Sequence, residues 1–253
     1  MKFLKGFSRI GVIAIILIIA FIGVASYLVI DGNNKATNYN NYDFYSIIEP
    51  TADNGYIGDN VKGSKDAPAI IFEYADFQCS YCALFNTRVN TAIEKSDGKL
   101  AVVYRNYLLS YHQNGTAAAS AAQAAGLQGY WKEYADKLFS NQNDWASTSP
   151  SERTALFDKY FEEVTEGKGD LEKFKEDIAS ENISKKISFD MGIGKRIDLS
   201  GTPSFYVDGQ HINLESKTGS SVTINGQTIS WDHSLSGDEF IQLLLDIAEA
   251  KAN

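Results

Sequence analysis

The only two cysteines in the sequence, Cys79 and Cys82, are separated by two residues. A disulfide that closes so short a loop restrains little of the unfolded chain, so a purely structural bridge explains the pair poorly. Two thiols this close can instead cycle between a dithiol and a disulfide. The spacing therefore favours thiol–disulfide exchange, and the structural bridge remains the alternative.

Zinc is the main rival explanation for a cysteine pair of this spacing. A tetrahedral structural zinc site needs four ligands, and the sequence holds no further cysteine. The three histidines, His112, His211 and His233, are scattered along the chain. We therefore expect no bound metal, and we interpret His112 and His211 as surface residues.

The segment around the cysteines indicates a strand, a helix and a second strand. Residues Ala69–Ala75 form a nearly continuous apolar run, which is typical of a strand covered on both faces. Cys79 begins a helical stretch that runs to about Ser96, and Leu100–Tyr107 has strand character again. This order predicts two parallel strands joined by a right-handed crossover.

The start of that helix gives the two cysteines different expected roles. The first turn of a helix has backbone N–H groups without intrahelical partners, and such groups stabilise a thiolate. Cys82 lies one turn further along and is expected to be more buried. We therefore expect Cys79 to attack and Cys82 to resolve the mixed disulfide.

The remaining elements are predicted from helical periodicity and turn signals. The pattern is helical from about residue 113 to 199, with a capping box and a first-turn proline at Ser149–Glu152. Strand character returns at Ser204–Val207, and Asn225-Gly226 predicts a hairpin turn. A last helix is expected to begin after Ser236, which caps it. The predicted element order of the whole domain is β-α-β, helices, then β-β-α.

These motifs together resemble the DsbA branch of the thioredoxin superfamily. The resemblance rests on the strand-CxxC-helix opening, the helical insertion, and Gly201-Thr202-Pro203 before a strand. It implies an α/β thioredoxin-like fold over residues 56–253, with the insertion at about 113–199. It also implies that no organic cofactor is bound.

The resemblance further implies a substrate-binding surface beside Cys79. In that family a cis-proline loop faces the active-site sulfur, and Thr202-Pro203 is the matching dipeptide. The alternative is that Pro203 only starts an edge strand. Ser80 and Tyr81 lie between the cysteines and belong to the same expected surface. Ser80 stands where the family commonly has proline, and Tyr81 stands where its strongest oxidants have histidine. These departures leave the oxidising strength of the pair open.

Glu73 interrupts the apolar strand six residues before Cys79, where thioredoxin-like sequences carry a buried acid. Burial would raise its pKa. We expect Glu73 to act as a proton acceptor that helps to deprotonate Cys82 during resolution. The alternative is a strand residue that is exposed or paired with a cation.

The N-terminal region predicts a membrane anchor. Residues 10–30 are uncharged and mostly aliphatic, and the segment is long enough for one transmembrane helix. The three basic residues among residues 1–9 place the N-terminal end in the cytoplasm. A cleaved signal peptide is the alternative, and it exports the body to the same side. We interpret residues 31–55, which are rich in asparagine, as a polar tether, although Phe44, Tyr45, Ile47 and Ile48 could dock on the domain.

The functional expectation is a single-pass plasma-membrane protein whose extracytoplasmic domain oxidises thiols of unfolded exported proteins, and which a membrane redox partner reoxidises. A disulfide reductase or isomerase, and a non-catalytic peptide-binding or assembly module, are the alternatives. The net charge of −9 disfavours nucleic-acid binding. We assign no function to residues 213–231.

Overall fold

The computed structural model describes residues 37–215 and 219–253, and the residues from Tyr39 onward form one structural unit. Its central sheet has the strand order β1-β3-β2-β4-β5. The pair β2 and β3 is parallel, as predicted, and the other neighbouring pairs are antiparallel. The strands are Asn60–Lys62 (β1), Ala69–Ala75 (β2), Leu100–Asn106 (β3), Ser204–Val207 (β4) and Gln210–Ile212 (β5).

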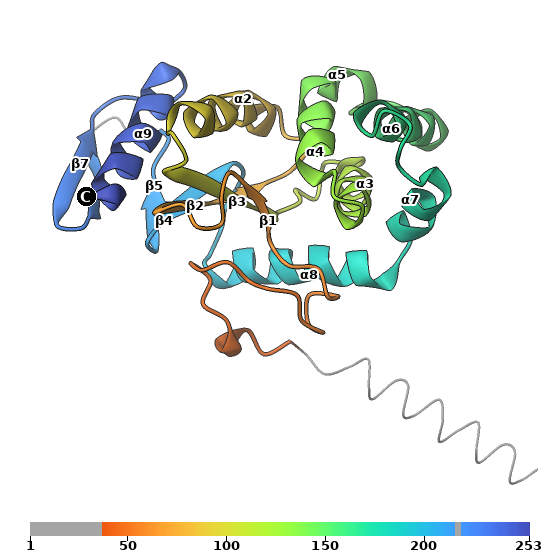
Figure 1. Ribbon diagram of the computed structural model, residues 1–253, viewed down its shortest axis with the longest axis horizontal. Coiled ribbons are helices and arrows are strands. Elements are labelled where there is room, and N and C mark those ends of the chain that lie inside the picture. The colour runs from red at the N-terminus through yellow and green to blue at the C-terminus, as the bar shows by residue number, and fades with distance from the viewer. Residues whose placement is uncertain (1–36, 216–218) are drawn as a thin grey trace, which may run out of the picture. The chain divides into compact units, whose positions relative to one another are not determined.

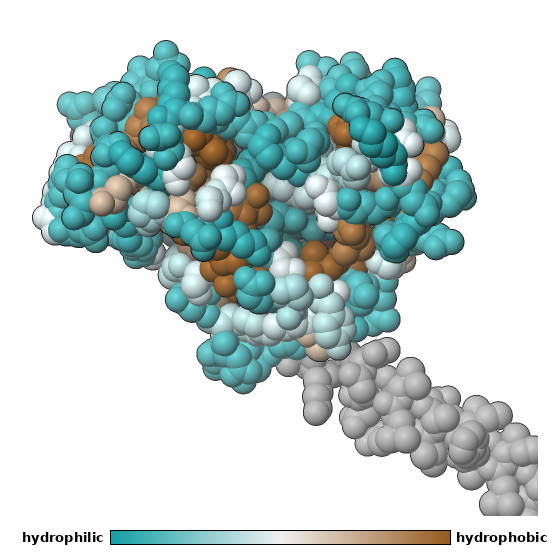
Figure 2. Space-filling view, in the orientation of Figure 1, coloured by the Kyte–Doolittle hydropathy of each residue, from teal (hydrophilic) through white to brown (hydrophobic). Residues whose placement is uncertain are grey.

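Helices cover both faces of this sheet (Figure 1). Helices α2 (Ser80–Lys95) and α9 (Asp238–Ala252) pack together on one face, and α8 (Glu181–Arg196) lies across the other. Figure 2 shows a face that is mostly hydrophilic, with separate apolar patches in its middle and toward both sides. The predicted α/β arrangement is confirmed.

The predicted helical insertion is confirmed between β3 and β4. Its first helix, α3, carries a row of buried alanines that lets neighbouring helices approach closely. At the start of α6, the Ser149 side chain accepts a hydrogen bond from the backbone of Glu152, whose carboxylate accepts one in return. Besides α8, the helices are Gly115–Leu127 (α3), Trp131–Ser140 (α4), Gln142–Trp145 (α5), Pro150–Val164 (α6) and Leu171–Ile178 (α7).

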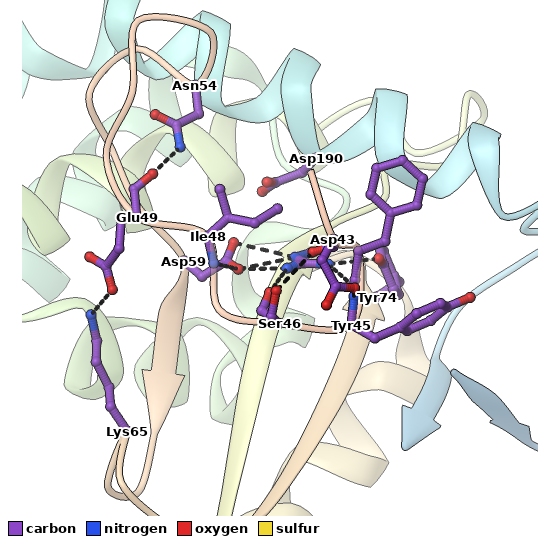
Figure 3. Close-up of polar contacts among 12 residues, drawn as sticks. Asp43, Tyr45, Ser46, Ile48, Glu49, Asn54, Asp59, Lys65, Tyr74 and Asp190 are labelled. Carbon is purple, nitrogen blue, oxygen red and sulfur yellow. Dashed lines mark hydrogen bonds and ion pairs between the residues drawn. The ribbon is translucent and has the colours of Figure 1, made fainter. Parts of the chain in front are cut away.

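The described part of residues 31–55, from Tyr39 onward, packs on the domain, which agrees with the alternative that its apolar residues dock there. The fully buried Arg105 donates hydrogen bonds to the carbonyl oxygens of Phe44 and Ser46. It also pairs with Asp59 at 2.7 Å, and Asp59 accepts a bond from the Ile48 backbone (Figure 3). Both backbone carbonyls and apolar side chains, among them the buried Ile48, hold the segment on the domain.

The C-terminal part contains the predicted hairpin and a helix start that differs from the prediction. Strands β6 (Ser220–Ile224) and β7 (Gln227–Trp231) form a separate two-stranded sheet. The Gln210 side chain joins it to β5 by bonding both backbone groups of Thr223. The last helix begins at Asp238 after Gly237, without a side-chain cap, so the predicted cap at Ser236 is wrong.

The predicted transmembrane segment at residues 10–30 lies outside the described residues. Within residues 37–215 and 219–253, every helix is too short or too polar to cross a membrane.

Candidate active site

Cys79 and Cys82 lie where the sheet meets helix α2. Cys79 follows the end of β2 and is the N-cap residue of the helix, with an extended backbone (φ −76°, ψ 122°). Both residues are free thiols in the structure. Cys79 is 7% exposed and Cys82 is fully buried, which confirms the predicted order of burial.

The surroundings give the two sulfurs opposite acidities. The pKa of Cys79 is lowered to about 6, because the Cys82 thiol and the backbone N–H groups of Cys82 and Tyr81 donate toward its sulfur against the opposing effect of burial. Burial raises the pKa of Cys82 well above its ordinary value, and the negative charge on Cys79 raises it further. At neutral pH the pair therefore holds a thiolate at Cys79 and a thiol at Cys82.

The loop before β4 brings Thr202 and Pro203 to Cys79. Strand β4 pairs antiparallel with β2, so its first residue, Ser204, lies opposite Tyr74 near the end of β2. The Cys79 Sγ atom lies 3.4 Å from the carbonyl oxygen of Thr202. The Thr202-Pro203 peptide bond is cis.

Ser80 and Tyr81 face outward from the first turn of α2. Both side chains are exposed, and the Tyr81 ring is 63% exposed, although large apolar residues are otherwise mostly buried. A molecule that reaches Cys79 can therefore contact Tyr81 without displacing any part of the fold.

Glu73 is buried in β2 on the sheet face that lies beneath α2. Burial raises its pKa to about 7, and the negative charges of Asp136 and Cys79 act in the same direction against the opposing charge of Lys62. Among the described residues, its Oε1 atom has no hydrogen-bond partner. The predicted rise in pKa is confirmed, and a carboxyl group with this pKa can both accept and donate a proton near neutral pH.

Lys62, the cation that opposes the effect of burial on the pKa of Glu73, has no signal in the sequence. Lys62 is 1% exposed on β1 and donates to Asp136 at 2.6 Å, to Asn90 at 3.1 Å, and to Asn86. The strand is too short and polar to be predicted, and only the spacing of the two asparagines along α2 hints at a shared partner.

The interpretation of His112 as a surface residue is also wrong. Its ring is 15% exposed, and its Nδ1 atom lies 2.9 Å from the buried carboxylate of Asp76, three residues before Cys79. His211 is at the surface, as predicted. His112 was misjudged because it follows the strand in an irregular loop, where periodicity gives no information about burial.

Gln142 is a further site residue without a sequence signal. Its side-chain amide donates to the carbonyl oxygens of Phe77 at 2.7 Å and of Cys79 at 3.0 Å. It belongs to the short helix α5, so the helical insertion supports the turn that carries Cys79. In the described ranges, no group of three or more His, Cys, Asp or Glu side chains is placed to hold a metal ion.

Comparisons with known proteins identify the family and relatives of the chain. A family model described as Thioredoxin matches residues 56–232. A curated relative, the Probable disulfide bond formation protein D of Bacillus cereus, is 28% identical over 181 residues, covering 67% of this chain and 81% of that protein. The Na(+)/H(+) antiporter NhaA 1 of Mycolicibacterium vanbaalenii is 31% identical over 156 residues, covering 60% of this chain. The chain spans only 23% of that antiporter's length.

Solved structures share the fold at low sequence identity. BdbD from Bacillus subtilis superposes with a TM-score of 0.58 at 18% identity, covering 83% of this chain and 98% of that one. Wolbachia pipientis alpha-DsbA1 superposes with a TM-score of 0.54 at 22% identity, covering 77% and 94%. The thioredoxin-like fold expected from the sequence is therefore confirmed.

Proposed function

The chain belongs to the thioredoxin family, and from that premise we propose that it is an extracytoplasmic protein thiol–disulfide oxidoreductase that works as a disulfide oxidase. The observation that carries the proposal is the contrast between two sulfurs one helical turn apart. Cys79 keeps 7% of its surface exposed and has a pKa of about 6, whereas Cys82 is fully buried and has a raised pKa. This contrast supports Cys79 as the exchanging sulfur and Cys82 as the resolving one.

In the proposed reaction the enzyme starts with a Cys79–Cys82 disulfide. A thiolate of an unfolded exported protein attacks Cys79 Sγ, a substrate–Cys79 bond forms, and the Cys79–Cys82 bond breaks. The electron pair stays on the Cys82 sulfur, which takes up a proton. A second substrate thiolate then attacks the substrate sulfur and releases the Cys79 thiolate. The substrate has lost two electrons and gained a disulfide, and the enzyme is left as the dithiol.

The acidity of Cys79 supports the oxidising direction. The thiolate is the group that leaves in the last step, and a thiol with a pKa of about 6 leaves mostly as the anion at neutral pH. Stabilising the reduced form makes the disulfide a stronger oxidant. The name of the Bacillus cereus relative, a probable disulfide bond formation protein, favours the same direction.

We propose that Glu73 supplies and removes the proton at Cys82. Cys82 is buried and reaches no solvent, so its proton must pass through a neighbouring group when the disulfide opens or closes. The charge of Glu73 raises the pKa of Cys82, so the two groups act on each other. With its own pKa at about 7, Glu73 can give a proton in one direction and accept it in the other.

We propose a substrate segment from the surface around Cys79, and a membrane redox partner from the predicted anchor. An extended segment that pairs with the loop at Thr202 and Pro203 lies beside the Cys79 sulfur, and the exposed Tyr81 ring offers it an apolar contact. Residues 10–30 would anchor the domain to the membrane, where a partner protein reoxidises the dithiol.

The equilibrium reduction potential of the purified full chain in glutathione buffers tests the direction. We expect a value near ~−120 mV, as for strong oxidants, and a value near ~−270 mV would support a reductase instead. Oxidation of a reduced two-cysteine peptide by the disulfide form is the matching activity assay. Absence of exchange in that assay would favour the peptide-binding module.

A further inference from the structure

Asp76 is a buried carboxylate at the base of the turn that carries Cys79. Its Oδ1 atom accepts a hydrogen bond from the Gln78 backbone at 2.8 Å, and its carbonyl oxygen accepts one from the Cys79 backbone at 3.0 Å. Its Oδ2 atom accepts a bond from the Leu109 backbone at 2.8 Å. One side chain therefore joins the turn after β2 to the loop after β3.

His112 is the side chain that completes this set of bonds. Its Nδ1 atom lies 2.9 Å from Asp76 Oδ2, which is an acceptor, so Nδ1 carries the hydrogen that is shared. The Tyr111 ring packs against the His112 ring edge to face, with 4.6 Å between centroids. The imidazole is thus held between a buried acid and an exposed aromatic ring.

The space around Asp76 leaves its carboxylate little freedom. A Cβ atom at Gly115 would lie 2.9 Å from Asp76 Oδ1, so α3 begins in contact with the acid. A buried carboxylate that loses a donor must move or find another partner. Since the Gln78 backbone N–H is bonded to the Asp76 carboxylate, movement of the acid would disturb the residue directly before Cys79, and with it the start of α2.

We propose that His112 is a positioning residue of the thiol site, which holds Asp76 by a hydrogen bond and so fixes the turn that presents Cys79. This inference rests on the proposed function and adds a residue to the same site. The backbone N–H groups of Tyr81 and Cys82 stabilise the Cys79 anion only if the first turn of α2 keeps its direction. A hydrogen bond made by His112, 33 positions after Cys79 in the chain, thereby affects the reactivity of the Cys79 sulfur.

Two variants separate the hydrogen bond from the imidazole ring. In His112→Asn, the side-chain amide can place a donor close to the position of Nδ1, whereas His112→Leu removes the donor and keeps an apolar side chain of similar bulk. His233→Leu is the matched control. It removes a histidine that also pairs with an aspartate, Asp232, at 3.1 Å, but with half of its side chain exposed.

The readout is the rate at which iodoacetamide alkylates Cys79 in the reduced full chain at pH 6, together with the reduction potential and the urea unfolding midpoint. We expect His112→Leu to slow alkylation by about fivefold, because a rise of one unit from a pKa of about 6 reduces the thiolate fraction at pH 6 from about a half to about a tenth, and to make the potential more negative. His112→Asn and His233→Leu should stay within about twofold of the wild type, since a change of that size is below half a pKa unit.

Three results bear on the inference. A His112→Leu protein that unfolds more easily but keeps the wild-type alkylation rate and potential would show a structural role only, and would overturn it. A His112→Asn protein as slow as His112→Leu would also overturn it, because the hydrogen bond would not be the cause. A wild-type Cys79 with an ordinary thiol titration would instead defeat the proposed function itself.

Discussion

The carbonyl oxygen of Thr202 lies 3.4 Å from the Sγ atom of Cys79, although 123 positions separate the two residues in the chain. Antiparallel pairing of β4 with β2 creates this contact, because it returns the chain to the end of the strand that leads into Cys79. The loop therefore lies next to the sulfur, so a segment that binds the loop, as we propose, would lie beside the reactive atom.

Thr202→Val should raise the pKa of Cys79 by less than one unit. The Thr202 side chain favours the anion less than the Cys82 thiol and backbone do, and its Oγ1 atom has no hydrogen-bond partner among the described residues, so the effect is small. Valine keeps nearly the same volume. Thiolate absorbance at 240 nm as a function of pH measures the shift. Thr228→Val, which changes an exposed threonine of β7, is the control and should leave the titration unchanged.

Substitution of the two cysteines should separate their roles. Cys79→Ser should abolish turnover, because the buried Cys82 cannot meet a substrate thiol. Cys82→Ser should accumulate mixed disulfides, because a captured partner is no longer displaced. Non-reducing gels after trapping with acid reveal the complexes. Complexes that accumulate with Cys79→Ser instead would reverse the assignment.

The reduced protein should gain stability relative to the oxidised protein as pH rises. The folded pKa of Cys79 is lowered from 9.0 to about 6, so its contribution is present above the unfolded pKa and is lost as pH falls through 6. Between pH 5 and pH 8 we expect a gain of roughly 2 to 3 kcal/mol. Urea unfolding of both forms at each pH measures the difference, and an unchanged difference would contradict the lowered pKa.

Glu73→Gln should stabilise the protein at pH 8 and slow its chemistry. The folded pKa of Glu73 is raised from 4.5 to about 7, so stability is full below pH 4.5 and declines as pH rises toward 7. Removing this carboxyl group should therefore raise the free energy of unfolding by roughly 3 kcal/mol at pH 8, with little change at pH 4.

The kinetic effect of Glu73→Gln distinguishes a proton carrier from a buried strand residue. The rate at which reduced enzyme resolves a mixed disulfide should fall by about 10²-fold or more at pH 7, because glutamine carries no proton between Cys82 and its surroundings. Glu49→Gln, at an exposed acid, is the control. An unchanged resolution rate in a stabilised Glu73→Gln protein would remove the acid from the mechanism.

The parts of this fold that follow from local patterns were predictable. The strand at Ala69–Ala75 is apolar on both faces, Ser149 caps a helix with its own neighbours, and Asn225-Gly226 forms a turn in which both residues have positive φ. Cys79 and Cys82 belong to the same group, because their spacing and their place at a helix start are both local.

The parts that depend on contacts between distant segments were not predictable. Lys62 meets Asp136 across 74 positions, and His112 meets Asp76 across 36. A single polar residue has no period, and its burial depends on which segment covers it. The same reason explains why the sequence allows docking of the N-terminal segment but does not identify its partner Arg105, which looks like an ordinary charge within a strand.

Arg105→Met should destabilise the domain and release the N-terminal segment. Arg105 and Lys186 hold the pKa of Asp59 below its ordinary value despite burial, and both ion pairs are fully buried. Removing one partner of a buried pair costs about 3 to 5 kcal/mol, since the other charge keeps its desolvation penalty.

The measurement for this variant is urea unfolding combined with limited proteolysis of residues 39–55. Arg105 also bonds the carbonyls of Phe44 and Ser46, so cleavage in that segment should become faster than cleavage elsewhere. Lys65→Met is the control, because its pair with Glu49 is more than half exposed on both sides and should contribute less than about 1 kcal/mol. If Arg105→Met and Lys65→Met unfold alike and are cut at the same sites, the segment is held by its apolar contacts with Phe189 and Tyr206 rather than by the buried arginine.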